Sequence, residues 1–99
     1  MAKRMNIRRI YGEVNTPRDI VLINQKIRGQ IRRARTRARI TELVKRSAYL
    51  RTLTYSPGFR KHLAGKIRLA RKIAKLEYTK TAKLANKKLG AKVYDEKWG

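Results

Sequence analysis

The stretch that decides the fold is TPRDIVLINQKIRGQIRRARTRA, residues 16–38. It opens with a helix start, because the side-chain oxygen of Thr16 can accept a backbone N–H of the first turn. Pro17 suits the first helical position, where its missing N–H has no intrahelical use, and Asp19 is favoured near the positive end of the helix dipole. We therefore predict a helix that begins at Pro17.

Apolar residues follow this start at three- and four-residue steps, which place them on one face of a helix. The stripe slips after Ala38, so either the helix bends near residues 36–41 or the surface that buries it changes along its length. We predict one helix over residues 17–53, about 55 Å long at 1.5 Å per residue, which would protrude into a larger assembly. The first stripe is Ile20, Ile23, Ile27, Ile31, Ala34 and Ala38, and the second is Ile40, Leu43, Val44 and Leu50.

A second helix is predicted over residues 57–89. Ser56 can cap it and Pro57 can take its first position, while Gly90 follows at the place of a left-handed C-cap. Two long helices joined by a short loop pack antiparallel most simply. The sequence therefore predicts an all-α fold, with an antiparallel helical hairpin over residues 16–90.

Arms are expected on both sides of this hairpin. Residues 1–15 lack helix-capping signals and are predicted to form an extended basic arm. Residues 91–99 combine charges with aromatic side chains and are predicted to form a tail that docks through its aromatics.

The charge of the chain indicates its partner. Of 99 residues, 28 are Lys or Arg and six are Asp or Glu, which gives a net charge of +22. Cations at this density repel one another across a compact surface, so a polyanion must neutralise them in the working state. Nucleic acid is the commonest such partner.

Other classes of function are disfavoured. The chain has no cysteine, which removes disulfides, zinc knuckles and thiol catalysis, and a lone histidine, His62, cannot build a triad or a metal site. We therefore expect no enzyme, no catalytic residue, no metal or other cofactor and no small-molecule substrate. Cations on nearly every helix face disfavour a membrane-surface protein, and no signal peptide is visible, so no membrane partner is expected.

The densest cationic stretch lies on the predicted first helix. Arg can bond one phosphate twice and stack on an exposed base, and few acids are spaced to pair with this stretch. Gly29 interrupts it, and we expect it to mark a close approach of a nucleic-acid backbone or of the partner helix. Glu42 and Glu77 are interpreted as local ion-pair partners. The predicted RNA-binding residues are Lys3, Arg4, Arg8, Arg9, Arg28, Arg32, Arg33, Arg35, Arg37, Arg39, Arg46, Arg60, Lys61, Arg68, Arg71, Lys72 and Trp98.

The whole chain resembles the small basic ribosomal proteins in character. It shares with them a Met-Ala-Lys-Arg start, helices built on isolated apolar residues, an absence of cysteine and extensions at both ends. The resemblance implies binding to ribosomal RNA, contact with neighbouring ribosomal proteins and a place in the cytoplasmic ribosome. Abundant Ile, Lys and Arg with few Asn and Gln hint at a thermophile, and an archaeal ribosome is our expectation. A DNA-packaging or chromatin protein is the alternative, because charge alone fits both.

Overall fold

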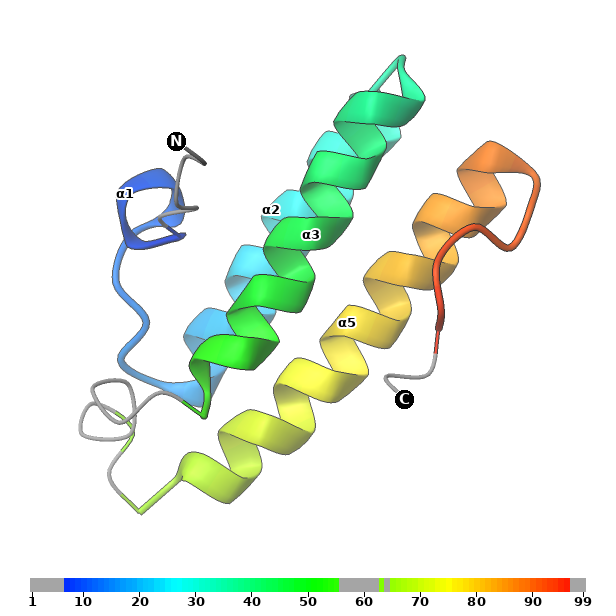
Figure 1. Cartoon of the computed structure of the whole chain (residues 1–99). Coiled ribbons are helices and arrows are strands. Elements are labelled where there is room, and N and C mark those ends of the chain that lie inside the picture. The colour runs from blue at the N-terminus through cyan, green and yellow to red at the C-terminus, as the bar shows by residue number, and fades with distance from the viewer. Residues whose placement is uncertain (1–6, 56–62, 64, 97–99) are drawn as a thin grey trace, which may run out of the picture.

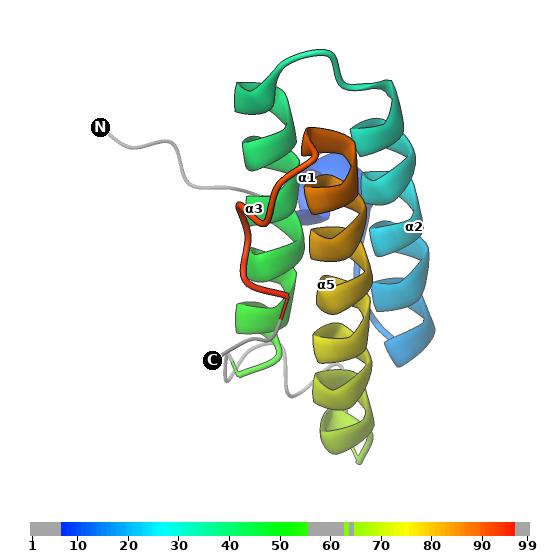
Figure 2. The same cartoon turned by 90° about the vertical axis from the view of Figure 1, so that its right-hand side faces the viewer.

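The computed structural model describes residues 7–55, 63 and 65–96. This part of the chain is 76% helical and contains no strand, as the predicted all-α class requires. No helix in it is long and apolar enough to span a bilayer. The helices are α1 (Ile7–Tyr11), α2 (Pro17–Arg33), α3 (Arg37–Leu53) and α5 (Ile67–Leu89). Three of them, α2, α3 and α5, run side by side as a bundle (Figures 1 and 2).

The start of α2 is the predicted one. The Thr16 hydroxyl accepts from the Asp19 N–H at 3.3 Å, and the Asp19 carboxylate accepts in return from the Thr16 N–H at 2.9 Å. This reciprocal capping box satisfies two backbone donors that the helix itself leaves unpaired. Below it the first apolar stripe is buried from Ile20 to Ile31.

The predicted single helix over residues 17–53 is wrong, because the chain folds back at residues 34–36. The Ala34 N–H closes α2 on the Ile31 carbonyl, and the Thr36 side chain caps α3 by accepting from the Arg39 N–H at 3.2 Å. The slip of the apolar stripe has its reason here. One rigid helix would leave its two stripes on different faces without a common partner, whereas the reversal lets α2 and α3 bury both stripes in one core.

The second predicted helix is shorter than expected. Its predicted start at residue 57 lies outside the described residues, but α5 itself begins at Ile67, after Gly65 with φ of 74° and Lys66 outside the helix. Its end was predicted correctly, because Gly90 adopts the left-handed conformation with φ of 70°. The described fold is therefore a three-helix bundle in place of a two-helix hairpin.

Part of the predicted N-terminal arm is also helical. Ile7–Tyr11 forms the short helix α1, which ends at Gly12, where φ is 95°. Ile7 is buried in the same core as α2 and α3, and Tyr11 packs against that core from one turn later. The i, i+4 spacing of these two apolar residues suits the helix, because it turns both side chains toward the core.

The C-terminal segment returns along the bundle after α5 (Figure 1). The buried Asn86 side chain holds it, because its oxygen accepts from the Val93 and Tyr94 N–H groups, both at 2.9 Å, and its nitrogen donates to the Tyr94 carbonyl at 2.8 Å. The Tyr94 hydroxyl lies 2.5 Å from that of Thr41 on α3. Docking through an aromatic is thus confirmed for Tyr94, whereas Trp98 lies outside the described residues.

A polar cluster sits among the three long helices. The buried Asn24 oxygen of α2 accepts hydrogen bonds from Ser47 of α3 at 2.5 Å and from Thr81 of α5 at 3.2 Å. Its amide nitrogen donates to the Ile20 carbonyl at 2.9 Å. Because a buried polar group without a partner is costly, this cluster fixes the register of the three helices relative to one another.

Candidate nucleic-acid interface

One end of the bundle concentrates exposed cations. There α2 ends, α3 begins and α5 ends (Figure 2), and each of these three chain segments contributes basic residues. The exposed residues that form this surface, which we call the basic end, are Arg32, Arg33, Arg35, Arg37, Lys87 and Lys88.

The basic end is held together by Lys88. Its ammonium group donates to the Ile31 carbonyl at 2.8 Å and to the Arg32 carbonyl, which are among the last carbonyls of α2. These carbonyls lie in the last turn of α2, where a cation complements the negative end of the helix dipole, and the Ile31 carbonyl also accepts the Ala34 N–H. Lys88 thereby ties α5 to α2 and positions the Arg residues of the turn beside the end of α5.

No acid belongs to the turn between α2 and α3, and the nearest one along the chain is Glu42. Glu42 pairs with Arg39 at 3.2 Å and with Arg46 at 2.8 Å, as its spacing predicted. Partial burial works against the charged form, but the hydrogen bond from Arg39 and the charge of Arg46 lower the pKa of Glu42 below its ordinary value. Glu42 thus offsets cations of α3, whereas Arg32, Arg35 and Arg37 form no ion pair with any residue that the structure describes.

Two of the predicted binding residues are engaged inside the protein. The Arg28 guanidinium lies 2.9 Å from the Glu77 carboxylate of α5, and their side chains are only 13% and 4% exposed. Glu77 also pairs with Lys80 at 3.1 Å, which confirms the predicted local pair. The pair with Arg28 was missed, although Glu77 shares a helix face with Ala70, Ala74 and Thr81, and an acid on an apolar face needs a buried cation.

Arg46 is the second engaged cation. It donates to the Tyr11 hydroxyl at 3.0 Å and to Glu42 at 2.8 Å. Partial burial alone would lower the pKa of Arg46, but these bonds outweigh it and raise that pKa above its ordinary value. Together with the reversal at residues 34–36, this means that Arg28, Arg35 and Arg46 do not lie along one helix, as the predicted helix over residues 17–53 required.

The remaining predicted residues lie elsewhere. Arg8 and Arg9 are exposed on α1, where Arg8 pairs with Glu13. At the opposite end of the bundle Arg68 and Lys72 are exposed, while the Arg71 guanidinium stacks 4.2 Å from the centre of the Tyr55 ring. The predicted residues that fall outside the described part of the chain are Lys3, Arg4, Arg60, Lys61 and Trp98.

Gly29 does not mark a close approach of another helix. A Cβ atom built there would meet nothing within 4 Å, so the space beside it is open. An approach of a nucleic-acid backbone to this position stays a prediction.

No protein-family model, no curated protein and no solved structure matches this chain. Its function is therefore inferred from its charge and from the geometry of the basic end.

Proposed function

We propose that this protein is a structural component of the ribosome that binds and stabilises ribosomal RNA through Arg–phosphate and Lys–phosphate contacts. The observation that carries the proposal is the basic end, where six exposed cations from three chain segments meet without an acid in the turn that joins α2 to α3. Neighbouring ribosomal proteins are the second class of partner in this proposal.

The mechanism is electrostatic positioning. The planar forks of Arg32, Arg35 and Arg37 can each take a phosphate with two hydrogen bonds, and the N-terminal end of α3 adds its dipole to the same site. Each neutralised phosphate releases condensed counterions, which drives binding and makes it depend on salt. The protein would hold converging RNA segments in place and would carry out no reaction on them.

The shape of the basic end favours RNA over a DNA duplex. Helices that read duplex DNA place an exposed helical face along the major groove. Here the cations cluster on a turn and on helix ends, which fit the crevice between irregularly packed backbones better than a regular groove. DNA packaging is therefore the alternative outcome of the tests below.

The basic end is tested by the triple variant Arg32→Gln, Arg35→Gln, Arg37→Gln. Arg39 is left unchanged because it pairs with Glu42. We expect weaker binding to ribosomal RNA, with the slope of log K against log salt reduced by about 2 units, since each lost single-strand phosphate contact removes about 0.7. Filter binding across a salt series measures both quantities.

The matched control removes the same charge elsewhere, in Arg18→Gln, Lys45→Gln, Lys75→Gln, three exposed cations away from the basic end. It should change the slope far less than the first triple variant. Equal losses in both variants would show that net charge alone binds RNA, and would remove the basic end from the proposal.

The ribosomal setting is tested by sedimenting tagged protein from a cell lysate through a sucrose gradient at low and at high salt. Co-migration with one subunit at both salt concentrations supports an integral ribosomal protein. Co-migration with DNA, or a shift to the top of the gradient after nuclease removes DNA, supports the chromatin alternative.

A further inference from the structure

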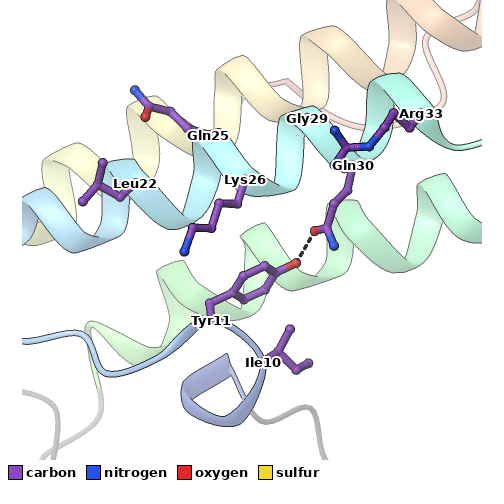
Figure 3. Close-up of a pocket in the computed structure, with 8 residues that line it drawn as sticks. All are labelled: Ile10, Tyr11, Leu22, Gln25, Lys26, Gly29, Gln30 and Arg33. Carbon is purple, nitrogen blue, oxygen red and sulfur yellow. Dashed lines mark hydrogen bonds between the residues drawn. The ribbon is translucent and has the colours of Figure 1, made fainter.

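A groove of about 670 Å³ lies between α1 and α2 (Figure 3). That volume is within the usual range for small-ligand sites. The side chains of Ile10 and Tyr11 border it from α1, and α2 contributes Gly29, whose missing side chain leaves the wall open. The groove ends at Arg33, which is also part of the basic end, so the two surfaces are continuous.

A chain of hydrogen bonds orients one polar group in this groove. Arg46 donates to the Tyr11 oxygen at 3.0 Å, and a guanidinium can only donate, so this oxygen is an acceptor there. The Tyr11 hydroxyl hydrogen is then free to go to Gln30, whose side-chain oxygen lies 2.6 Å away (Figure 3).

This hydrogen bond fixes the orientation of the Gln30 amide. Its oxygen accepts from the Tyr11 hydroxyl, and its NH₂ group faces away from that hydroxyl. This NH₂ group donates no hydrogen bond to any residue in the described part of the chain. The groove thus offers an oriented donor beside an aromatic ring, and the donor is available to a ligand.

The other charges of the groove are cations. Lys26 points from α2 toward Tyr11 in Figure 3, and Arg33 follows seven residues later, about 10 Å along the helix. A ligand that fits has a flat apolar face, hydrogen-bond acceptors on its edge and negative charge on both sides. An unstacked nucleotide within an RNA strand has all three features.

We propose that this groove binds one unstacked RNA base that carries a keto group, guanine or uracil, with its flanking phosphates on Lys26 and Arg33. The inference rests on the proposed RNA-binding function and adds a base-specific site to it. The keto preference follows from the Gln30 NH₂ donor, because guanine presents an acceptor at O6 and uracil at O4, whereas adenine and cytosine present an amino donor at the corresponding position.

The test uses a short RNA hairpin with one bulged nucleotide, which is G, U, A, C or abasic, and the same hairpin without a bulge. Fluorescence polarisation gives the dissociation constants, which are compared among the RNAs at one salt concentration and then followed over a salt series. We expect bulged G or U to bind about tenfold more tightly than the abasic bulge, as one stacked base contributes, and A or C to bind less tightly than G or U.

Two variants locate the effect. Gly29→Leu fills the groove and should abolish the preference for a bulged base without changing the affinity for the unbulged hairpin, and Gly29→Ala should reduce it. Gln30→Met should keep the bulge preference and lose the distinction between keto and amino bases. Thr52→Leu, at an exposed position of α3, is the matched control and should behave like the wild type.

The outcomes separate this proposal from the proposed function. If the wild type binds all hairpins equally and with strong salt dependence, the groove proposal is overturned and RNA binding by the basic end stands. If Gly29→Leu keeps the bulge preference, the base binds elsewhere, and the groove proposal is likewise overturned. Absence of salt-dependent binding to any of these RNAs contradicts the proposed function itself.

Discussion

Gly29 and Gly90 occupy equally open positions in opposite backbone conformations. A Cβ atom would meet nothing within 4 Å at either residue, but Gly29 lies within α2, whereas Gly90 has φ of 70°. Gly29→Ala should therefore raise the free energy of unfolding by about 0.5–1 kcal/mol, because alanine loses less conformational entropy in a helix. Gly90→Ala should lower it by about 1 kcal/mol, since the left-handed region strains an L-residue.

Urea unfolding followed by circular dichroism measures both changes. The two substitutions are controls for each other, because they add the same methyl group in the same absence of neighbours. A loss of stability in Gly29→Ala would contradict the expectation that alanine suits this position of α2 better than glycine.

Asp19 makes the stability of α2 depend on acid. Hydrogen bonds from the Asn15 and Thr16 backbone N–H groups outweigh partial burial and hold the pKa of Asp19 below its ordinary value of 3.8. The folded-state pKa is thus lower than the unfolded one, so this carboxylate stabilises the fold fully above about pH 4 and ceases to do so as the pH falls through the folded pKa. The free energy of unfolding should therefore decrease when the pH is lowered below about 4.

The comparison is with Asp19→Asn, which keeps the shape of the cap and cannot titrate. Thermal unfolding measured between about pH 2 and pH 6 should show a steeper acid loss in the wild type than in the variant. Parallel curves would show that other carboxylates, such as Glu42, account for the acid sensitivity.

At the scale of the helices, the sequence predicted where the helical bundle starts and ends better than it predicted the chain reversal between α2 and α3. The start of α2 and the end of α5 were predictable because Pro17 and Gly90 have backbone requirements that few other positions share. The break between α2 and α3 was not, because Ala34, Arg35 and Thr36 include no proline or glycine to mark it. Only the slip of the apolar stripe indicated this break. A bend in one helix and a reversal of the chain explain such a slip equally well.

The sequence predicted which Arg residues form the candidate interface, but it did not predict how the fold arranges them. The Arg-rich stretch identified the cations, but their positions depended on the turn at residues 34–36. Lys88 joins them through its hydrogen bond to the Ile31 carbonyl, 57 residues earlier in the chain. The pairing of Tyr11 with Gln30 across 19 residues likewise left no signal in the local pattern.

The docking of the whole C-terminal segment onto the bundle should depend on Asn86. Replacing Asn86 with Ala removes the acceptor of the Val93 and Tyr94 N–H groups and the donor to the Tyr94 carbonyl. We expect the segment to detach while the three long helices persist, so that hydrogen exchange at Val93 and Tyr94 approaches the unprotected rate. Lys87→Ala, one exposed residue later, should leave this exchange unchanged.

For the whole molecule, salt should act in opposite directions on folding and on binding. The net charge of +22 destabilises the free protein by self-repulsion, and salt screens it as the Debye length falls from about 10 Å at 0.1 M to about 3 Å at 1 M. The melting temperature of the free protein should therefore rise with salt, while its affinity for RNA falls. Calorimetry and filter binding over one salt series test both; a melting temperature that falls with salt would contradict the prediction.

The bonds from Lys88 to the end of α2 also bear on the order in which the protein matures. During synthesis the Arg residues of the turn emerge more than 50 residues before the lysine that joins them to α5, since Lys88 follows Ile31 by 57 positions. A nascent chain can form α2 and α3 early, but it cannot complete the basic end until Lys88 has left the tunnel. The bond between Lys88 and Ile31 therefore makes the basic end a late-forming part of the fold, assembled well after the turn that supplies its Arg residues.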